Sequence, residues 1–164
     1  MKSHPLFRIQ LAGRDGFIAL TPCPATKGID LIDTIKQFKR AGVAAVVTLL
    51  SDHELQQLGV YNLKEVCTDH GLSWVQCAIE DGGVPDHTML ALWRQYVPDF
   101  INITETKGVA IHCVGGSGRT GLVAAMLLRH LGYTESQAIE AVQAQRPTAL
   151  TRPNQRDFFT NYLM

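Results

Sequence analysis

The stretch from Val109 to Leu122 holds the residues best suited to chemistry in this 164-residue chain. An apolar run ends in His112-Cys113, a glycine-rich segment follows, and Arg119-Thr120 opens a long apolar segment. The pattern predicts a buried strand, a tight loop and a helix that begins where the loop ends. Backbone N–H groups of such a loop and of the helix N-terminus form an anion site. Cys113 would lie beside the anion as a nucleophilic thiolate, and Arg119 would close the site.

Two other phosphate-binding motifs share features with this stretch. Gly116, Gly118 and Gly121 match the spacing of the dinucleotide fingerprint, but that motif needs a second parallel strand after the helix, and another helix start follows instead. A Walker A loop needs a lysine where Arg119 stands. The simplest alternative for Cys113 is a buried structural thiol at a strand end. That alternative leaves the arginine six residues later unexplained.

His112-Cys113, five further residues and Arg119-Thr120 resemble the signature loop of the cysteine-dependent protein tyrosine and dual-specificity phosphatases. Other segments resemble the kinase-associated phosphatase (cyclin-dependent kinase inhibitor 3) branch of that superfamily: residues 21–24, 46–50, 79–86 and the tail around Gln155. The resemblance covers most of the chain from Thr21 onward. It implies a metal-independent phosphomonoester hydrolase that acts on phosphoproteins through a phosphocysteine intermediate. Phosphotyrosine-only and dual specificity both stay open.

The resemblance also implies roles for single residues. Cys113 would attack phosphorus, Arg119 would bind the phosphate oxygens, and Asp81 would protonate the leaving group. His112 would order the loop, Thr120 would donate a hydrogen bond to the departing sulfur, and Gln155 would position the hydrolytic water. The intervening residues are uncharged and would bind phosphate through their backbone: Val114, Gly115, Gly116, Ser117 and Gly118.

Several of these assignments have alternatives. Glu80 is the reserve for Asp81 as the acid, whereas Asp86 follows a proline and precedes a helical pattern, so we expect it to be an N-cap. Thr120 could simply cap its helix. The residues that compete with Gln155 are Gln143 and Gln145.

The uncharged loop also bears on the substrate. Lipid phosphatases of the wider superfamily tend to carry lysines there, which disfavours an inositide. A small-molecule substrate and a non-catalytic phosphate-binding module are the remaining alternatives. A low-molecular-weight phosphatase or a related reductase would carry its cysteine loop ahead of its acid, whereas Asp81 precedes Cys113 here.

Composition limits the other functions. Fifteen basic and fifteen acidic residues cancel, so no global field favours nucleic acid or a membrane surface. No apolar stretch reaches the length of a membrane span, and the first residues lack a signal-peptide pattern. Cys23, Cys67, Cys77 and Cys113 form no metal-binding spacing, so we expect no metal or cofactor and a cytoplasmic location, where thiols stay reduced. Oxidised Cys113 could pair with Cys67 or Cys77. The oligomeric state is not readable.

The positioning elements follow from periodicity and capping. We expect a single α/β domain over residues 1–164, with a central, mostly parallel sheet, an N-terminal hairpin and helices on both faces, at the size of a dual-specificity phosphatase. Ser51 with Glu54 and Thr134 with Gln137 read as capping boxes. Ile32, Ile35 and Phe38 should lie near one buried face of the helix over 29–40. Pro98 should kink or split the helix that starts at His87. The expected strands are 7–11, 17–20, 43–50, 73–79 and 109–112, and the expected helices are 29–40, 52–58, 61–70, 87–103, 122–131, 135–145 and 154–163.

Overall fold

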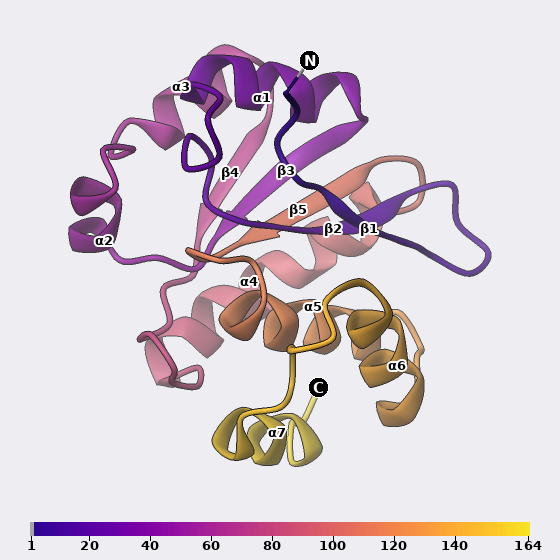
Figure 1. The fold of residues 1–164 in the computed structure, drawn as a ribbon. Helices are drawn as coiled ribbons and strands as arrows, with labels where there is room; N and C mark the ends of the chain where they lie inside the picture. Colours follow the sequence, from indigo (N-terminus) through magenta and orange to yellow (C-terminus); the bar gives the residue numbers. More distant parts are fainter. Residues whose placement is uncertain (1) are drawn as a thin grey trace.

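A computed structural model describes residues 2–164 as one five-stranded mixed sheet with helices on both faces (Figure 1). The strand order is β1-β2-β5-β3-β4. The first two strands form an antiparallel hairpin, and the other pairings are parallel. The strands are β1 (Phe7–Gln10), β2 (Phe17–Thr21), β3 (Val43–Thr48), β4 (Ser73–Gln76) and β5 (Gly108–His112).

The helices of the described residues divide between the two faces of the sheet. The first group, α1 and α3, packs against β3 and β4, and α4, α5 and α6 cover the opposite face. The last helix, α7, packs on the outside of α5. The helices are α1 (Leu31–Arg40), α2 (Asp52–Gln57), α3 (Leu63–Asp69), α4 (His87–Ile103), α5 (Gly118–His130), α6 (Glu135–Gln145) and α7 (Pro153–Thr160).

The central strand β5 and the helix that follows it form the core. Every residue of β5 is buried, because it pairs with parallel strands on both sides and is covered on both faces. In α5 every residue from Arg119 to Leu128 is buried as well. The segment between strand and helix is therefore anchored at both ends in a close-packed interior, which fixes its position.

The predicted fold class is confirmed, and the differences lie at element ends. Strands β3 and β4 end at Thr48 and Gln76, although the next residues, Leu49 and Cys77, still donate backbone hydrogen bonds to neighbouring strands and are buried. Helix α4 runs unsplit through Pro98. Ile32 was predicted on the buried face of α1 but is 49% exposed, because Thr34 takes the core position beside Ile35 and Phe38. Both capping boxes are present as predicted.

None of the helices formed by residues 2–164 combines the length and the apolar character needed to cross a membrane.

Candidate active site

The segment between β5 and α5, residues 113–118, is called the Cys113 loop below. Gly116 adopts φ = +79°, and a Cβ there would lie 2.5 Å from the backbone carbon of Thr21. Only glycine fits this close approach without strain. The loop therefore packs tightly against the end of β2, which pairs with β5 up to Thr21 and His112.

Three successive carbonyls of the Cys113 loop are bound from outside the loop. His112 Nδ1 lies 3.0 Å from the oxygen of Cys113, the Cys23 N–H donates to the oxygen of Val114 at 2.9 Å, and Arg146 Nη2 donates to that of Gly115 at 3.1 Å. In a trans peptide the N–H points opposite to the C=O. The N–H groups of residues 114–116 therefore face the other side, as an anion-binding concavity requires.

That concavity is a cavity of about 130 Å³ at the carboxyl end of β5. It brings together Asp81, Cys113, Arg119 and Gln155 as the sequence predicted. Thr120 lies beneath it and donates a hydrogen bond to Cys113 Sγ at 3.1 Å. Of the predicted phosphate-binding residues, Val114, Gly115, Ser117 and Gly118 line the cavity.

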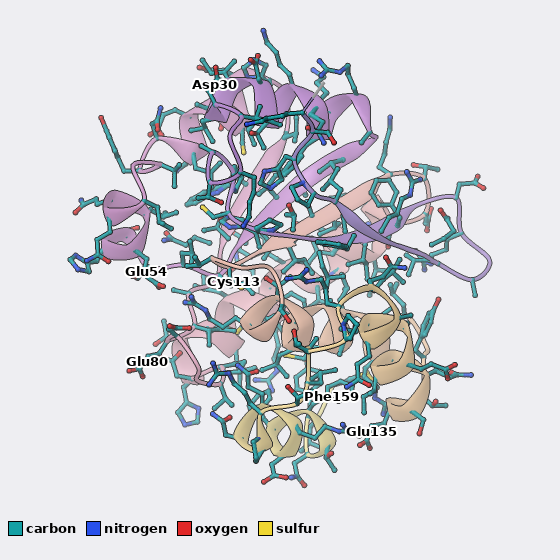
Figure 2. The ribbon with its side chains drawn as sticks, viewed as in Figure 1. Asp30, Glu54, Glu80, Cys113, Glu135 and Phe159 are labelled. Atoms are coloured by element: carbon teal, nitrogen blue, oxygen red, sulfur yellow. The ribbon has the colours of Figure 1, made fainter. Side chains whose placement is uncertain are left out.

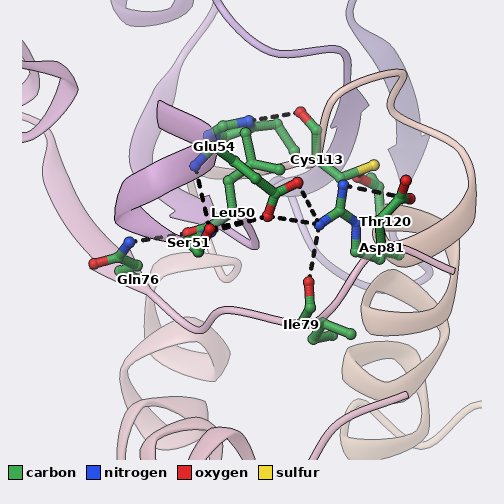
Figure 3. Close-up of polar contacts among 10 residues, drawn as sticks. Leu50, Ser51, Glu54, Gln76, Ile79, Asp81, Cys113 and Thr120 are labelled. Carbon is green, nitrogen blue, oxygen red and sulfur yellow. Dashed lines mark hydrogen bonds and ion pairs between the residues drawn. The ribbon is translucent and has the colours of Figure 1, made fainter. Parts of the chain in front are cut away.

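Arg119 is held in place by three residues, Glu54, Ile79 and Asp81, which are labelled in Figure 3. Its Nη1 donates to both carboxylate oxygens of Glu54, at 3.1 and 3.0 Å, and to the carbonyl of Ile79 at 2.9 Å. Its Nη2 lies 3.6 Å from Asp81 Oδ1. The Arg119 side chain is only 3% exposed, so these partners compensate a buried charge. Figure 2 shows Cys113 near the middle of the view, with Glu54 and Glu80 toward its left edge.

Residues 80–86, called the Asp81 loop below, lie beside the cavity. Asp86 Oδ1 accepts from the N–H of Met89 at 2.8 Å, so Asp86 is the N-cap of α4 as predicted. Asp81 lines the cavity, and its side chain is 85% exposed. Glu80 is not among the lining residues. The geometry therefore favours Asp81 over its reserve.

His112 is the last member of a buried hydrogen-bond chain. The indole N–H of Trp74 donates to Thr48 Oγ1 at 2.8 Å, and Thr48 Oγ1 lies 2.7 Å from His112 Nε2. Burial lowers the pKa of His112 to about 4, so the ring is neutral and carries one N–H. Because the carbonyl of Cys113 accepts from Nδ1, Nε2 must accept from the Thr48 hydroxyl. This chain orients the first peptide of the Cys113 loop.

Gln155 is buried on α7 and connects that helix to the Asp81 loop. Its Nε2 donates to the carbonyl of Gly83 at 3.0 Å, whereas its Oε1 is buried without a hydrogen-bond partner among the described residues. Asn154 Nδ2 donates to the carbonyl of Gly82 at 2.8 Å. The start of α7 therefore holds the Asp81 loop at two successive carbonyls.

Comparison with known proteins places this arrangement in a family. Residues 25–132 match the family model described as "Polymorphic toxin system, DSP-PTPase phosphatase". Cyclin-dependent kinase inhibitor 3 of Sus scrofa is 31% identical over 149 residues, which are 87% of this chain and 68% of that protein. The chain belongs to the dual-specificity and tyrosine phosphatase family.

Further family members agree with this assignment. Tyrosine-protein phosphatase cdcA of Emericella nidulans is 30% identical over 75% of this chain, which spans only 19% of that protein's length. A solved kinase-associated phosphatase, whose catalytic-site cysteine is replaced by serine, superposes with a TM-score of 0.83 at 22% identity and covers 99% of both chains. At that identity the superposition supports the fold, and the family assignment rests on the sequence matches.

Sequence reasoning missed Glu54, the partner of Arg119 in the candidate site. Glu54 was assigned only to a capping box, because nothing in the sequence signals its long-range pairing with Arg119 across 65 residues. The predicted disulfide between Cys113 and Cys67 or Cys77 stays a prediction, since all four cysteines are free. Burial raises the pKa of Cys67 to about 12 and that of Cys77 to about 11, which disfavours their thiolates. Residues 2–164 include no cluster of three potential metal ligands.

Proposed function

We propose that this protein hydrolyses phosphomonoesters on phosphoproteins through a phosphocysteine intermediate. The observation that carries the proposal is the convergence of a sulfur, a guanidinium and a carboxylate on one small cavity. Cys113, Arg119 and Asp81 all line it, although Asp81 and Cys113 come from separate loops. A buried structural thiol would need neither an adjacent arginine nor outward-facing loop carbonyls.

In the first step Cys113 Sγ attacks phosphorus, the S–P bond forms, and the bond from phosphorus to the leaving oxygen breaks. The N–H groups of the Cys113 loop and the guanidinium of Arg119 bind the equatorial oxygens, on which transition-state charge spreads. Asp81 donates its proton to the leaving oxygen. The charge of Arg119 is directed to this site because Glu54 and Ile79 fix its orientation.

In the second step a water molecule attacks phosphorus, and the S–P bond breaks to release inorganic phosphate. Asp81, now a carboxylate, accepts the proton of that water. We propose that Gln155 orients this water, because its Oε1 is a buried acceptor at the cavity and has no other hydrogen-bond partner among residues 2–164. The hydroxyl of Thr120, 3.1 Å from the sulfur, stabilises the departing thiolate.

Initial rates on matched phosphotyrosine and phosphothreonine peptides test the proposal. They are measured with a chelator present and with two variants, Cys113→Ser and Cys67→Ala. Cys67 is a matched control, because its thiol is buried on α3 away from the cavity. We expect the wild type and Cys67→Ala to hydrolyse at least one peptide and Cys113→Ser to hydrolyse neither. Retained phosphate binding without hydrolysis in the wild type would instead support the non-catalytic module.

The same peptide rates show whether the protein hydrolyses phosphotyrosine alone or phosphothreonine as well. A deep cleft admits only the longer phosphotyrosine, whereas a shallow one admits phosphothreonine as well. Hydrolysis of soluble phosphate esters with neither peptide cleaved would favour the small-molecule alternative.

We further propose that the protein acts in the cytoplasm on protein substrates and binds neither nucleic acid nor membranes. The cytoplasm keeps a reactive thiol reduced, and the balanced charge offers no general attraction to polyanions. Cell fractionation of a tagged protein, with vesicle and oligonucleotide binding assays, tests these points. Enrichment in a membrane fraction would contradict them.

A further inference from the structure

Arg152 is the second cation of the cavity, and the mechanism above does not use it. It is one of the cavity-lining residues, together with Asp81, Cys113, Arg119 and Gln155. It is the residue before Pro153, the first residue of α7. Nothing in its local sequence suggests a role, because the phosphatase loop lies more than 30 residues earlier.

The position of Arg152 relative to the Asp81 loop is fixed by the surrounding backbone. Its carbonyl accepts from the N–H of Arg156 at 2.9 Å, and the next residues of α7 bind the carbonyls of Gly82 and Gly83. Its guanidinium lies against Gly82: a Cβ built on that glycine would be 3.4 Å from Arg152 Nη1. The side chain therefore lies along the rim, next to the residue proposed as the acid.

The Arg152 guanidinium makes no hydrogen bond or ion pair with residues 2–164. Arg119, by contrast, already has Glu54, Ile79 and Asp81 as partners. The scissile phosphate is matched by Arg119 and the loop N–H groups at the base of the cavity. A second, unpaired guanidinium at the rim is thus complementary to a second negative group.

We propose that Arg152 determines specificity by binding a second anionic group, either a carboxylate or another phosphate, on a phosphopeptide beside the residue that is dephosphorylated. The inference rests on the proposed function and names its substrate class. The planar fork of a guanidinium suits both kinds of anion, since it can donate two parallel hydrogen bonds. Because Arg152 is exposed, the attraction is screened by salt and its effect is moderate.

The test uses one phosphopeptide in four versions, with Glu, Gln, Lys or a second phosphoresidue next to the scissile phosphate. The readout is the ratio of kcat/KM for each charged version to that for the Gln version. For the wild type we expect a ratio of about threefold to fivefold for Glu, a larger one for the second phosphate, and a decline of both at high salt. The two anionic versions distinguish a carboxylate from a phosphate.

Two substitutions and a control make the readout specific. Arg152→Gln should bring the Glu ratio close to one, and Arg152→Glu should favour the Lys version instead. Arg156→Gln is the control, because Arg156 lies on the same helix but not at the cavity, and it should keep the wild-type ratios. A reversal by charge swap cannot arise from misfolding.

The outcomes separate the inference from the proposed function. A wild type that cleaves all versions equally, or an Arg152→Gln variant that keeps the wild-type ratios, would overturn the role of Arg152 alone. A wild type that cleaves no peptide would overturn the proposed function as well. Soluble inositol phosphates are tested as further substrates. If the wild type prefers them to peptides and Arg152→Gln loses that preference, the second anion belongs to a lipid headgroup, and the phosphopeptide assignment is overturned.

Discussion

At the residue scale, the buried polar groups around Cys113 each have one defined geometry. The chain Trp74–Thr48–His112 ends on the carbonyl of Cys113, and Thr120 ends on its sulfur. Fully satisfied networks of this kind rigidify a core, whereas loss of one member leaves the others unpaired at a cost of about 1–3 kcal/mol. Cys113 is therefore positioned from two directions, at its carbonyl by His112 and at its sulfur by Thr120.

Titration of His112 should make the protein unstable in acid. Its pKa is about 4 in the folded state because of burial, against about 6.5 in an unfolded chain, so the unfolded state binds more protons between these values. The free energy of unfolding should therefore fall as the pH drops from about 6.5 to 4, by roughly 3 kcal/mol from this residue. Chemical denaturation at several pH values across that range measures this fall in the free energy of unfolding.

The control for this prediction is a second histidine, at an exposed position. His53→Gln, at an exposed position of α2, should keep the pH slope, and His112→Gln should flatten it whatever its absolute stability. An unchanged slope in His112→Gln would assign the acid sensitivity to other groups.

Glu54 should affect both stability and activity, although it does not line the cavity. Glu54→Gln removes the charge that faces a guanidinium only 3% exposed, and an uncompensated buried charge is costly. We expect a loss of about 2 kcal/mol in stability and about a tenfold loss in kcat/KM, since Arg119 would no longer be held in one orientation. Thermal unfolding and steady-state rates measure both effects.

The matched control is Glu65→Gln, on the exposed side of α3. Equal effects in the two variants would refute the pairing of Glu54 with Arg119 as the cause.

At the element scale, two adjacent glycines of the Cys113 loop offer a matched comparison. Gly116→Ala would place a methyl group 2.5 Å from the Thr21 backbone at a positive φ, whereas Gly115→Ala meets nothing within 4 Å. We expect Gly116→Ala to lose about 1–3 kcal/mol of stability and Gly115→Ala to lose much less. Denaturant unfolding of both variants decides this, and equal stabilities would show that the loop can shift away from β2.

Element types were predictable because local chemistry determines them. The capping pairs Ser51–Glu54 and Thr134–Gln137 mark helix starts within four residues of sequence, and the unbroken apolar run of β5 signals a strand covered on both faces. Ile32 was misplaced because one turn of helix periodicity cannot tell which of two neighbouring apolar positions faces the sheet. The site was partly predictable for the same reason: the Cys113 loop is a local motif, whereas Glu54 and Arg152 reach it only through tertiary packing.

At the scale of the whole molecule, the site joins segments from across the chain. Helix α2, the Asp81 loop and the Cys113 loop follow β3, β4 and β5 at the carboxyl edge of these parallel strands (Figure 1). The first residues of α7 reach this edge by binding the Asp81 loop. The contact of α7 with the Asp81 loop joins residues 72 apart. Helix α7 is thereby coupled to the position of Asp81, the proposed acid.

That coupling predicts a substrate-dependent defect in Asn154→Ala. The substitution removes one of the two bonds from α7 to the Asp81 loop, the one to the carbonyl of Gly82, without touching Cys113 or Arg119. A general acid contributes about 10²–10⁴-fold when the leaving group needs a proton. We therefore expect about a tenfold loss of kcat on the phosphopeptide that the protein hydrolyses and little loss on p-nitrophenyl phosphate, whose leaving group departs without protonation. Asp81→Asn should show the same pattern more strongly, and Asn161→Ala, at the other end of α7, should show neither defect. An equal loss on both substrates would mean that α7 supports the cavity as a whole rather than the position of the acid.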